Sequence, residues 1–192
     1  MPSIALSEWT GVRSSRLDQL VAARQVARGG RYPGQALNWS LVLVLCSEFQ
    51  GFTRELHGEA AGVLAAAMAR GNVSHFTLVR NNLLANRAID RANANANTLG
   101  EDFDRLGLDI WRDITNSVKS GGRWKQQLER LNRARNAIAH NNMGKLQTLR
   151  NEGYPITSQT VDSWRSACNG IGRQLDVLLT RHLTTLTGAR PW

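Results

Sequence analysis

Large hydrophobic side chains recur every three or four residues along most of the chain, which is the spacing of one face of an α-helix. The strict alternation of a half-buried strand is not found, and residues that favour helices dominate most of the length. The pattern therefore predicts an all-α protein. Its 192 residues suit a single domain, residues 1–192, with neither an internal repeat nor an interdomain linker.

Two long helices are predicted near the start of the chain. The first covers about residues 6–28 and ends at Gly29-Gly30. The second starts near Gln35, and we expect it to end or kink near His57-Gly58 before helical residues continue to a stop at Gly71-Asn72. Its broad apolar face consists of Leu37, Leu41, Val44, Leu45, Phe49, Phe52 and Leu56.

Shorter elements are predicted in the middle of the chain. Residues 76–89 form a helix, whereas the Ala-Asn alternation at residues 92–97 favours a loop, because asparagine side chains compete for backbone hydrogen bonds. Thr98 followed by Glu101 resembles a capping box, which would open a short acidic helix that stops near Gly107.

Two further long helices are predicted in the last third. One runs over about residues 123–142, after a break at Gly121-Gly122. The other is capped by Thr157 or Ser158 and continues to Gly188. The sequence thus predicts long helices joined by shorter ones.

Charge adds a candidate partner. The net charge of +9 comes from 24 basic and 15 acidic residues, and 21 of the basic residues are arginines, since only three are lysines. Arginine's planar guanidinium group suits phosphate, which makes nucleic acid a candidate partner; a genome that favours arginine codons explains the charge equally well. The basic residues concentrate between Arg123 and Arg135.

Several classes of protein are disfavoured. Cys46 and Cys168 lie in apolar helical patterns, and no histidine has ligand spacing to another His, Cys or acid, so we expect no metal and no cofactor. The longest apolar run is far shorter than the roughly 18 residues of a membrane span. We therefore expect a cytoplasmic protein without membrane contact.

Two charged residues stand where helical periodicity calls for apolar ones. Arg135 lies on the stripe of Leu131 and Ile138, and Glu48 lies on the apolar face of the second helix. A lone buried guanidinium group costs several kcal/mol, so Arg135 must pair with a carboxylate, line a cleft or lie at a subunit interface. A buried pair between Glu48 and Arg135 is the structural alternative to a functional role.

The residues that follow Arg135 add chemistry. Asn136 and His140 are four apart, so they lie on one flank of the helix, within reach of the long Arg135 side chain. One helix thus offers a permanent cation, an amide and a group that titrates near neutrality. Cleavage of a phosphodiester without a metal needs these three kinds of group.

The motif Arg135-Asn136-x-x-x-His140 resembles the R-x4-6-H motif of the HEPN superfamily, in which a polar residue often follows the arginine. An earlier apolar helix with an embedded acid, here Glu48, and a long amphipathic last helix are also similar. The resemblance covers about residues 35–187. Asn142 replaces the aromatic residue of one toxin branch, so the subfamily stays unassigned.

This resemblance implies an all-α, antiparallel helical bundle of the HEPN type, with additional helices between the second and penultimate core helices. It also implies a homodimer formed through the motif helices, and a metal-independent endoribonuclease of a toxin–antitoxin or antiviral defence system. A cognate antitoxin or a regulatory protein is then an expected partner. The alternatives are a non-catalytic HEPN-like module that binds RNA or protein, and a helical scaffold.

The resemblance also assigns roles. It makes His140 the general acid or base, Arg135 the ligand of the phosphate and transition state, and Asn136 the positioning group. Further contacts to the RNA backbone are expected from neighbours on the same helix, with Glu48 as a supporting residue. These neighbours are Lys125, Arg130, Asn132 and Arg133.

Overall fold

The computed structural model describes residues 1–27 and 34–192, and within these ranges the chain is all-α without strands. The predicted stop at Gly29-Gly30 lies outside the described residues. In chain order the elements are α1 (Ile4–Glu8), the π-helical turn η1 (Trp9–Arg13), α2 (Ser14–Ala27), α3 (Gly34–Ala69), α4 (Val73–Leu84), α5 (Ala88–Arg91), α6 (Ala96–Asp104), α7 (Ile110–Ser117), α8 (Gly121–Ala139), α9 (Met143–Asn151) and α10 (Ser158–Thr187).

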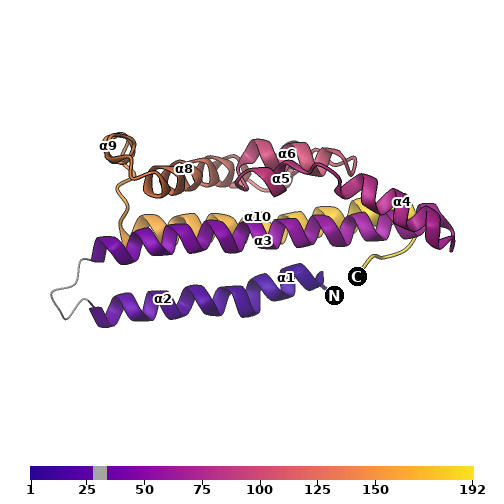
Figure 1. The fold of residues 1–192 in the computed structure, drawn as a ribbon, viewed down its shortest axis with the longest axis horizontal. Helices are drawn as coiled ribbons and strands as arrows, with labels where there is room; N and C mark the ends of the chain where they lie inside the picture. The colour runs from indigo at the N-terminus through magenta and orange to yellow at the C-terminus, as the bar shows by residue number, and fades with distance from the viewer. Residues whose placement is uncertain (28–33) are drawn as a thin grey trace.

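The 36-residue helix α3 runs along the length of the molecule beside α10 (Figure 1). Helices α1 and α2 pack on one side of α3, and α8 packs on α3 and α10 from the other. Successive long helices reverse direction, so α2 and α8 run opposite to α3, while α10 runs with it. The predicted all-α class is confirmed, and α4 to α7 lie between α3 and α8 along the chain.

The core follows this arrangement. Trp9 of η1 contacts Phe49 and Phe52 of α3 with ring centroids 5.5 Å apart in each pair. Trp164 of α10 and Leu131 of α8 are fully buried in the same cluster. Large apolar side chains from four parts of the chain therefore meet on α3, as the broad apolar face predicts.

Two predicted boundaries are wrong. Helix α3 continues without interruption through His57-Gly58, because His57 is buried and held by a contact to α6. Thr98 does not cap α6: the N-cap is Asn95, whose side-chain oxygen accepts the Thr98 N–H at 3.0 Å, while Thr98 itself is buried. Glu101 instead accepts a hydrogen bond from the Asn97 amide.

Other differences concern short helices. The predicted helix over residues 76–89 divides into α4 and α5, with Asn86 at a φ of 55° between them. Helices α7 and α9 occupy segments for which the pattern predicts no helix. The last helix matches its prediction, since Thr157 caps it and Gly188 ends it in the left-handed conformation.

A buried histidine of α3 contacts α6, and through it α5. His57 Nε2 lies 2.9 Å from the backbone carbonyl oxygen of Asp102, so the neutral ring donates this hydrogen bond. The Asp102 carboxylate accepts the backbone N–H groups of Ala88 and Ile89, each at 2.7 Å. Burial lowers the pKa of His57 to about 4, although the hydrogen bond to Asp102 opposes this shift.

No helix of the described ranges is both long and apolar enough to cross a membrane.

The buried His57 predicts a pH dependence of folding stability. Below pH 6.5 the unfolded chain binds a proton at this ring, whereas the folded chain does so only near pH 4. The free energy of unfolding should therefore fall as the pH drops through this window, by up to about 1.4 kcal/mol per pH unit from this group. Urea unfolding of His57→Gln should lack this contribution, whereas His75→Gln, at an exposed position of α4, should keep it. Equal slopes for His57→Gln and the wild type would contradict the assignment.

Candidate functional site

The motif residues lie at the C-terminal end of α8. Asn136 is in the last turn, and the helix ends at Ala139, three residues earlier than the sequence predicts. His140 is the C-cap and Asn141 adopts a φ of 48°, while the N–H groups of Asn141 and Asn142 donate to carbonyls of the last turn. This arrangement is a Schellman motif with asparagine in the left-handed position. It leaves the His140 side chain exposed at a sharp turn.

Asn142 has a second role at this turn. Its side-chain oxygen accepts the backbone N–H of Lys145 at 3.0 Å and so caps α9. Asn142 therefore closes the turn after α8 and is also the N-cap of α9. The direction of the chain on both sides of His140 is fixed by neighbouring asparagines.

Arg135 is half-buried and has an amide as its polar partner. Its Nη1 donates to Asn136 Oδ1 at 3.2 Å, and the Asn93 amide donates to the same oxygen at 2.8 Å. Among the described residues, no carboxylate lies within ion-pair distance of Arg135. Burial raises the pKa of the Cys46 thiol of α3 to about 12, and the charge of Arg135 opposes that shift. Cys46 Sγ lies 4.0 Å from the carbonyl oxygen of Leu131, so α8 packs on α3 about one turn before Arg135.

Glu48 does not pair with Arg135, so the structural alternative from the sequence is wrong. Its carboxylate oxygens accept hydrogen bonds from Arg13 at 2.7 Å and Arg16 at 2.9 Å. Burial raises the pKa of Glu48, but the hydrogen bonds from Arg16 and Arg13 outweigh it and the pKa falls below its ordinary value. The carboxylate faces the N-terminal helices, and periodicity along α3 gives no information on which neighbour covers that face.

The basic residues expected to contact RNA do not form one patch. Lys125 lies over the ring of Trp111, with its Nζ 5.4 Å from the centroid. Arg130 stacks on Tyr154 at 3.8 Å. Arg133 donates two hydrogen bonds, at 2.8 and 2.6 Å, to Glu152. Arg130 and Arg133 therefore face the segment after α9, whereas Lys125 faces α7.

Asn132 is buried and helps to hold the segment that leads into α6. Its amide donates to the carbonyl oxygen of Ala94 at 3.0 Å, and Glu129 accepts the Ala96 N–H at 2.7 Å. Asn93 in the same segment reaches Asn136, as described above. Three polar side chains of α8, spaced along one flank, thus fix residues 93–96, and this segment in turn fixes the amide beside Arg135.

The sequence does not identify Asn93 as part of the site. The only signal in the sequence is the Ala-Asn alternation of residues 92–97, which predicts a loop but no contact. Among the described residues, no group of three or more His, Cys, Asp or Glu side chains is arranged to hold a metal ion. No family model, curated protein or solved structure matches this chain.

The absence of a carboxylate beside Arg135 predicts different outcomes for two arginine variants. Arg135→Ala removes one long hydrogen bond and should change the free energy of unfolding by less than about 1 kcal/mol. Arg13→Ala removes a partner of the largely buried Glu48 and should cost about 1–3 kcal/mol. Urea denaturation monitored by circular dichroism measures both. A cost for Arg135→Ala equal to that for Arg13→Ala would show that Arg135 has a structural partner.

Proposed function

We propose that this protein is a metal-independent endoribonuclease of the HEPN type, acting in toxin–antitoxin or antiviral defence. The observation that supports this most is the half-buried guanidinium group of Arg135, which has an amide rather than a carboxylate beside it. A cation that is not neutralised is available to an anionic ligand. It lies five residues from an exposed imidazole, which is the ordinary acid–base group of enzymes at neutral pH.

In the proposed reaction the 2′-hydroxyl of RNA attacks its own 3′-phosphorus. The 2′-oxygen loses its proton as its bond to phosphorus forms, and the 5′-oxygen of the next nucleotide takes up a proton as its bond to phosphorus breaks. The products are a 2′,3′-cyclic phosphate and a 5′-hydroxyl end. His140 supplies general acid or base catalysis, and Arg135 stabilises the charge of the pentacovalent phosphorane.

Asn136 is a positioning residue in this scheme. Its side-chain oxygen accepts from Arg135 Nη1, and Asn93 holds that oxygen from the other side. The amide nitrogen of Asn136 is directed away from these two bonds and is a donor for a phosphate oxygen. A guanidinium group held in advance needs little reorganisation when the phosphate charge develops.

Contacts to the RNA backbone come from Arg130 and Arg133 on one side of α8 and from Lys125 on another. Arg133 is compensated by Glu152, so binding of a phosphate there has to displace or share the carboxylate. Asn132 is buried and does not contribute to this surface. RNA as the substrate is consistent with a cytoplasmic location, and an antitoxin or regulatory protein is the expected further partner.

The active form proposed is a homodimer with the motif helices packed across a two-fold axis. Within one chain the described contacts join Arg135 to Asn136 but do not join either side chain to His140. A second copy placed by a two-fold axis brings His140 toward the partner's Arg135. Met143, which follows His140 by three residues, is 56% exposed, and an exposed apolar side chain at this place favours an interface.

The second candidate function is a non-catalytic module that binds RNA or a protein. The exposed His140 favours this function, because its ring has no hydrogen-bond partner among the described residues that would set its tautomer or orientation. Cleavage distinguishes the two candidates, because binding does not need an acid–base group.

His140→Ala should lose RNA cleavage by about 10²–10⁴-fold while keeping its thermal stability, because the residue is exposed at a helix end. The assay incubates varied single-stranded RNAs with EDTA and detects 2′,3′-cyclic phosphate ends. His75→Ala, which changes an exposed histidine on α4, is the matched control and should cleave at the wild-type rate. A wild-type protein that yields no cyclic ends, or a fully active His140→Ala variant, would favour the binding module.

A mixture of Arg135→Ala and His140→Ala chains tests the dimer. If each site takes Arg135 from one chain and His140 from the other, a mixed dimer keeps one intact site. Equal mixing should then restore about a quarter of the wild-type rate, because half of the dimers are mixed and each has one of two sites. Sedimentation should give the mass of two chains. No restoration by a dimer that exchanges its chains would place the site within one chain, and a strict monomer would contradict the dimer itself.

A further inference from the structure

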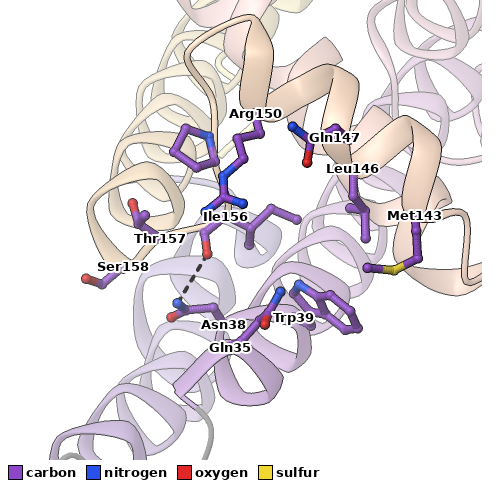
Figure 2. A pocket seen from close by; sticks show the side chains of 11 residues that line it. Gln35, Asn38, Trp39, Met143, Leu146, Gln147, Arg150, Ile156, Thr157 and Ser158 are labelled. Carbon is purple, nitrogen blue, oxygen red and sulfur yellow. Dashed lines mark hydrogen bonds between the residues drawn. The ribbon is translucent and has the colours of Figure 1, made fainter.

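A pocket opens between the start of α3, helix α9 and the segment that leads into α10 (Figure 2). Its volume is about 490 Å³, within the range of sites for small ligands. Trp39 lies on the α3 side, and Arg150 extends from α9 toward the space between the two helices. The pocket is not part of the Arg135 site, and the function proposed above gives it no role.

The two principal side chains are available to a ligand. Trp39 is half-buried, so part of its indole ring is exposed in the pocket. Arg150 is exposed, and its guanidinium group makes no hydrogen bond or ion pair with any described residue. Among the described residues that line the pocket, none is acidic. An aromatic face beside an uncompensated guanidinium group suits a planar ring that has a phosphate attached.

Hydrogen bonds within the protein position the polar groups around the indole ring of Trp39. The Asn38 amide donates to the carbonyl oxygen of Ile156 at 3.3 Å, and its own oxygen accepts from Arg24 at 3.3 Å. Arg24 is only 6% exposed, so it fixes Asn38 from behind and adds positive charge. Gln147 of α9 lies on the opposite side of the pocket and adds a second amide. Amides can bond to the edges of a nucleobase.

Two segments of the chain, helix α3 and the residues after His140, connect the pocket to the proposed cleavage site. Trp39 and Cys46 are seven residues apart on α3, which is about 10 Å along the helix axis. Cys46 Sγ lies 4.0 Å from the backbone carbonyl oxygen of Leu131, which precedes Arg135 by about one turn of α8. Met143, which lines the pocket, follows His140 by three residues. A strand whose phosphate is at Arg135 therefore needs to extend only a short distance to place a neighbouring base at Trp39.

We propose that this pocket binds one unpaired nucleotide of the RNA substrate, with the base stacked on Trp39 and a phosphate bound to Arg150. This inference rests on the proposed function, because it assigns the single-stranded RNA that the Arg135 site would cleave. A paired base is stacked within its duplex and is not free to enter, so the pocket selects single-stranded RNA.

The test measures binding and cleavage separately. Binding is followed by the anisotropy of a labelled single-stranded RNA in the His140→Ala background, where the RNA stays uncut. Trp39→Ala should weaken binding by about 5- to 150-fold, because a stacked base is lost, and Trp39→Phe should keep most of the affinity. Arg150→Gln should also weaken binding, whereas Arg80→Gln, an exposed arginine on α4, is the charge-matched control and should not.

A blunt-ended duplex of the same RNA with its complementary strand has no unpaired nucleotide, so it should bind Trp39→Ala and its parent equally. The pocket proposal is overturned if Trp39→Ala and Arg150→Gln, both folded by circular dichroism, bind single-stranded RNA as tightly as their parent. It is also overturned if a free mononucleotide competes as well as the oligonucleotide does, which would indicate a small-molecule site. If Trp39→Ala does not fold, Trp39→Phe and Arg150→Gln decide, and loss of affinity in Arg150→Gln alone supports the pocket.

Cleavage distinguishes this inference from the function on which it rests. Wild-type protein that binds RNA through Trp39 but yields no cyclic ends supports the pocket and overturns the endoribonuclease. Wild-type protein that cleaves, with Trp39 and Arg150 variants cleaving equally well at low RNA concentration, supports the endoribonuclease and overturns the pocket.

Discussion

The packing of helices around α3 depends on which neighbours form hydrogen bonds with its carboxylates. Its three carboxylates, Glu48, Glu55 and Glu59, are all used by the N-terminal segment. Glu48 and Glu55 bind Arg13, and Glu59 accepts backbone N–H groups at the start of α1. Because these acids share one stripe of α3, the stripe that faces α8 contains no acid, and Arg135 comes to lie against a neutral surface.

The polar residues on one flank of α8 bind another part of the same chain. Glu129, Asn132 and Asn136 form hydrogen bonds with the segment of residues 93–96, so these bonds stabilise the fold. The guanidinium group of Arg135 borders that flank and is oriented by it through Asn136. A charge that is positioned but not neutralised contributes little to stability. Its retention in a half-buried place therefore favours a role in binding over a role in folding.

The sequence predicts the long elements, because these depend on local periodicity and caps. Of the three motif residues, the described contacts join Arg135 to Asn136 and do not join either side chain to His140. Thr157 and Gly188 mark the ends of α10, and Glu48, Glu55 and Glu59 share a face as their spacing indicates. The partner of Glu48 was not predictable in the same way, since periodicity specifies a face but not the helix that packs on it. Asn93, Trp39 and Arg150 join their sites only through tertiary contacts.

Arg135 has a hydrogen-bond partner for its side chain and His140 has none among the described residues, and this difference bears on the proposed catalysis. The guanidinium group donates to Asn136, which Asn93 holds in turn. The imidazole extends from a C-cap, where the backbone is set by a Schellman turn and the side chain is exposed. A transition-state ligand benefits from being fixed in advance, because reorganisation would cost part of its stabilisation. An acid–base group has to be near two different oxygen atoms during the reaction, and its hydrogen bonds often form only in the complex. The free imidazole is therefore compatible with catalysis, and the turn that exposes it also directs α9 toward the pocket at Trp39.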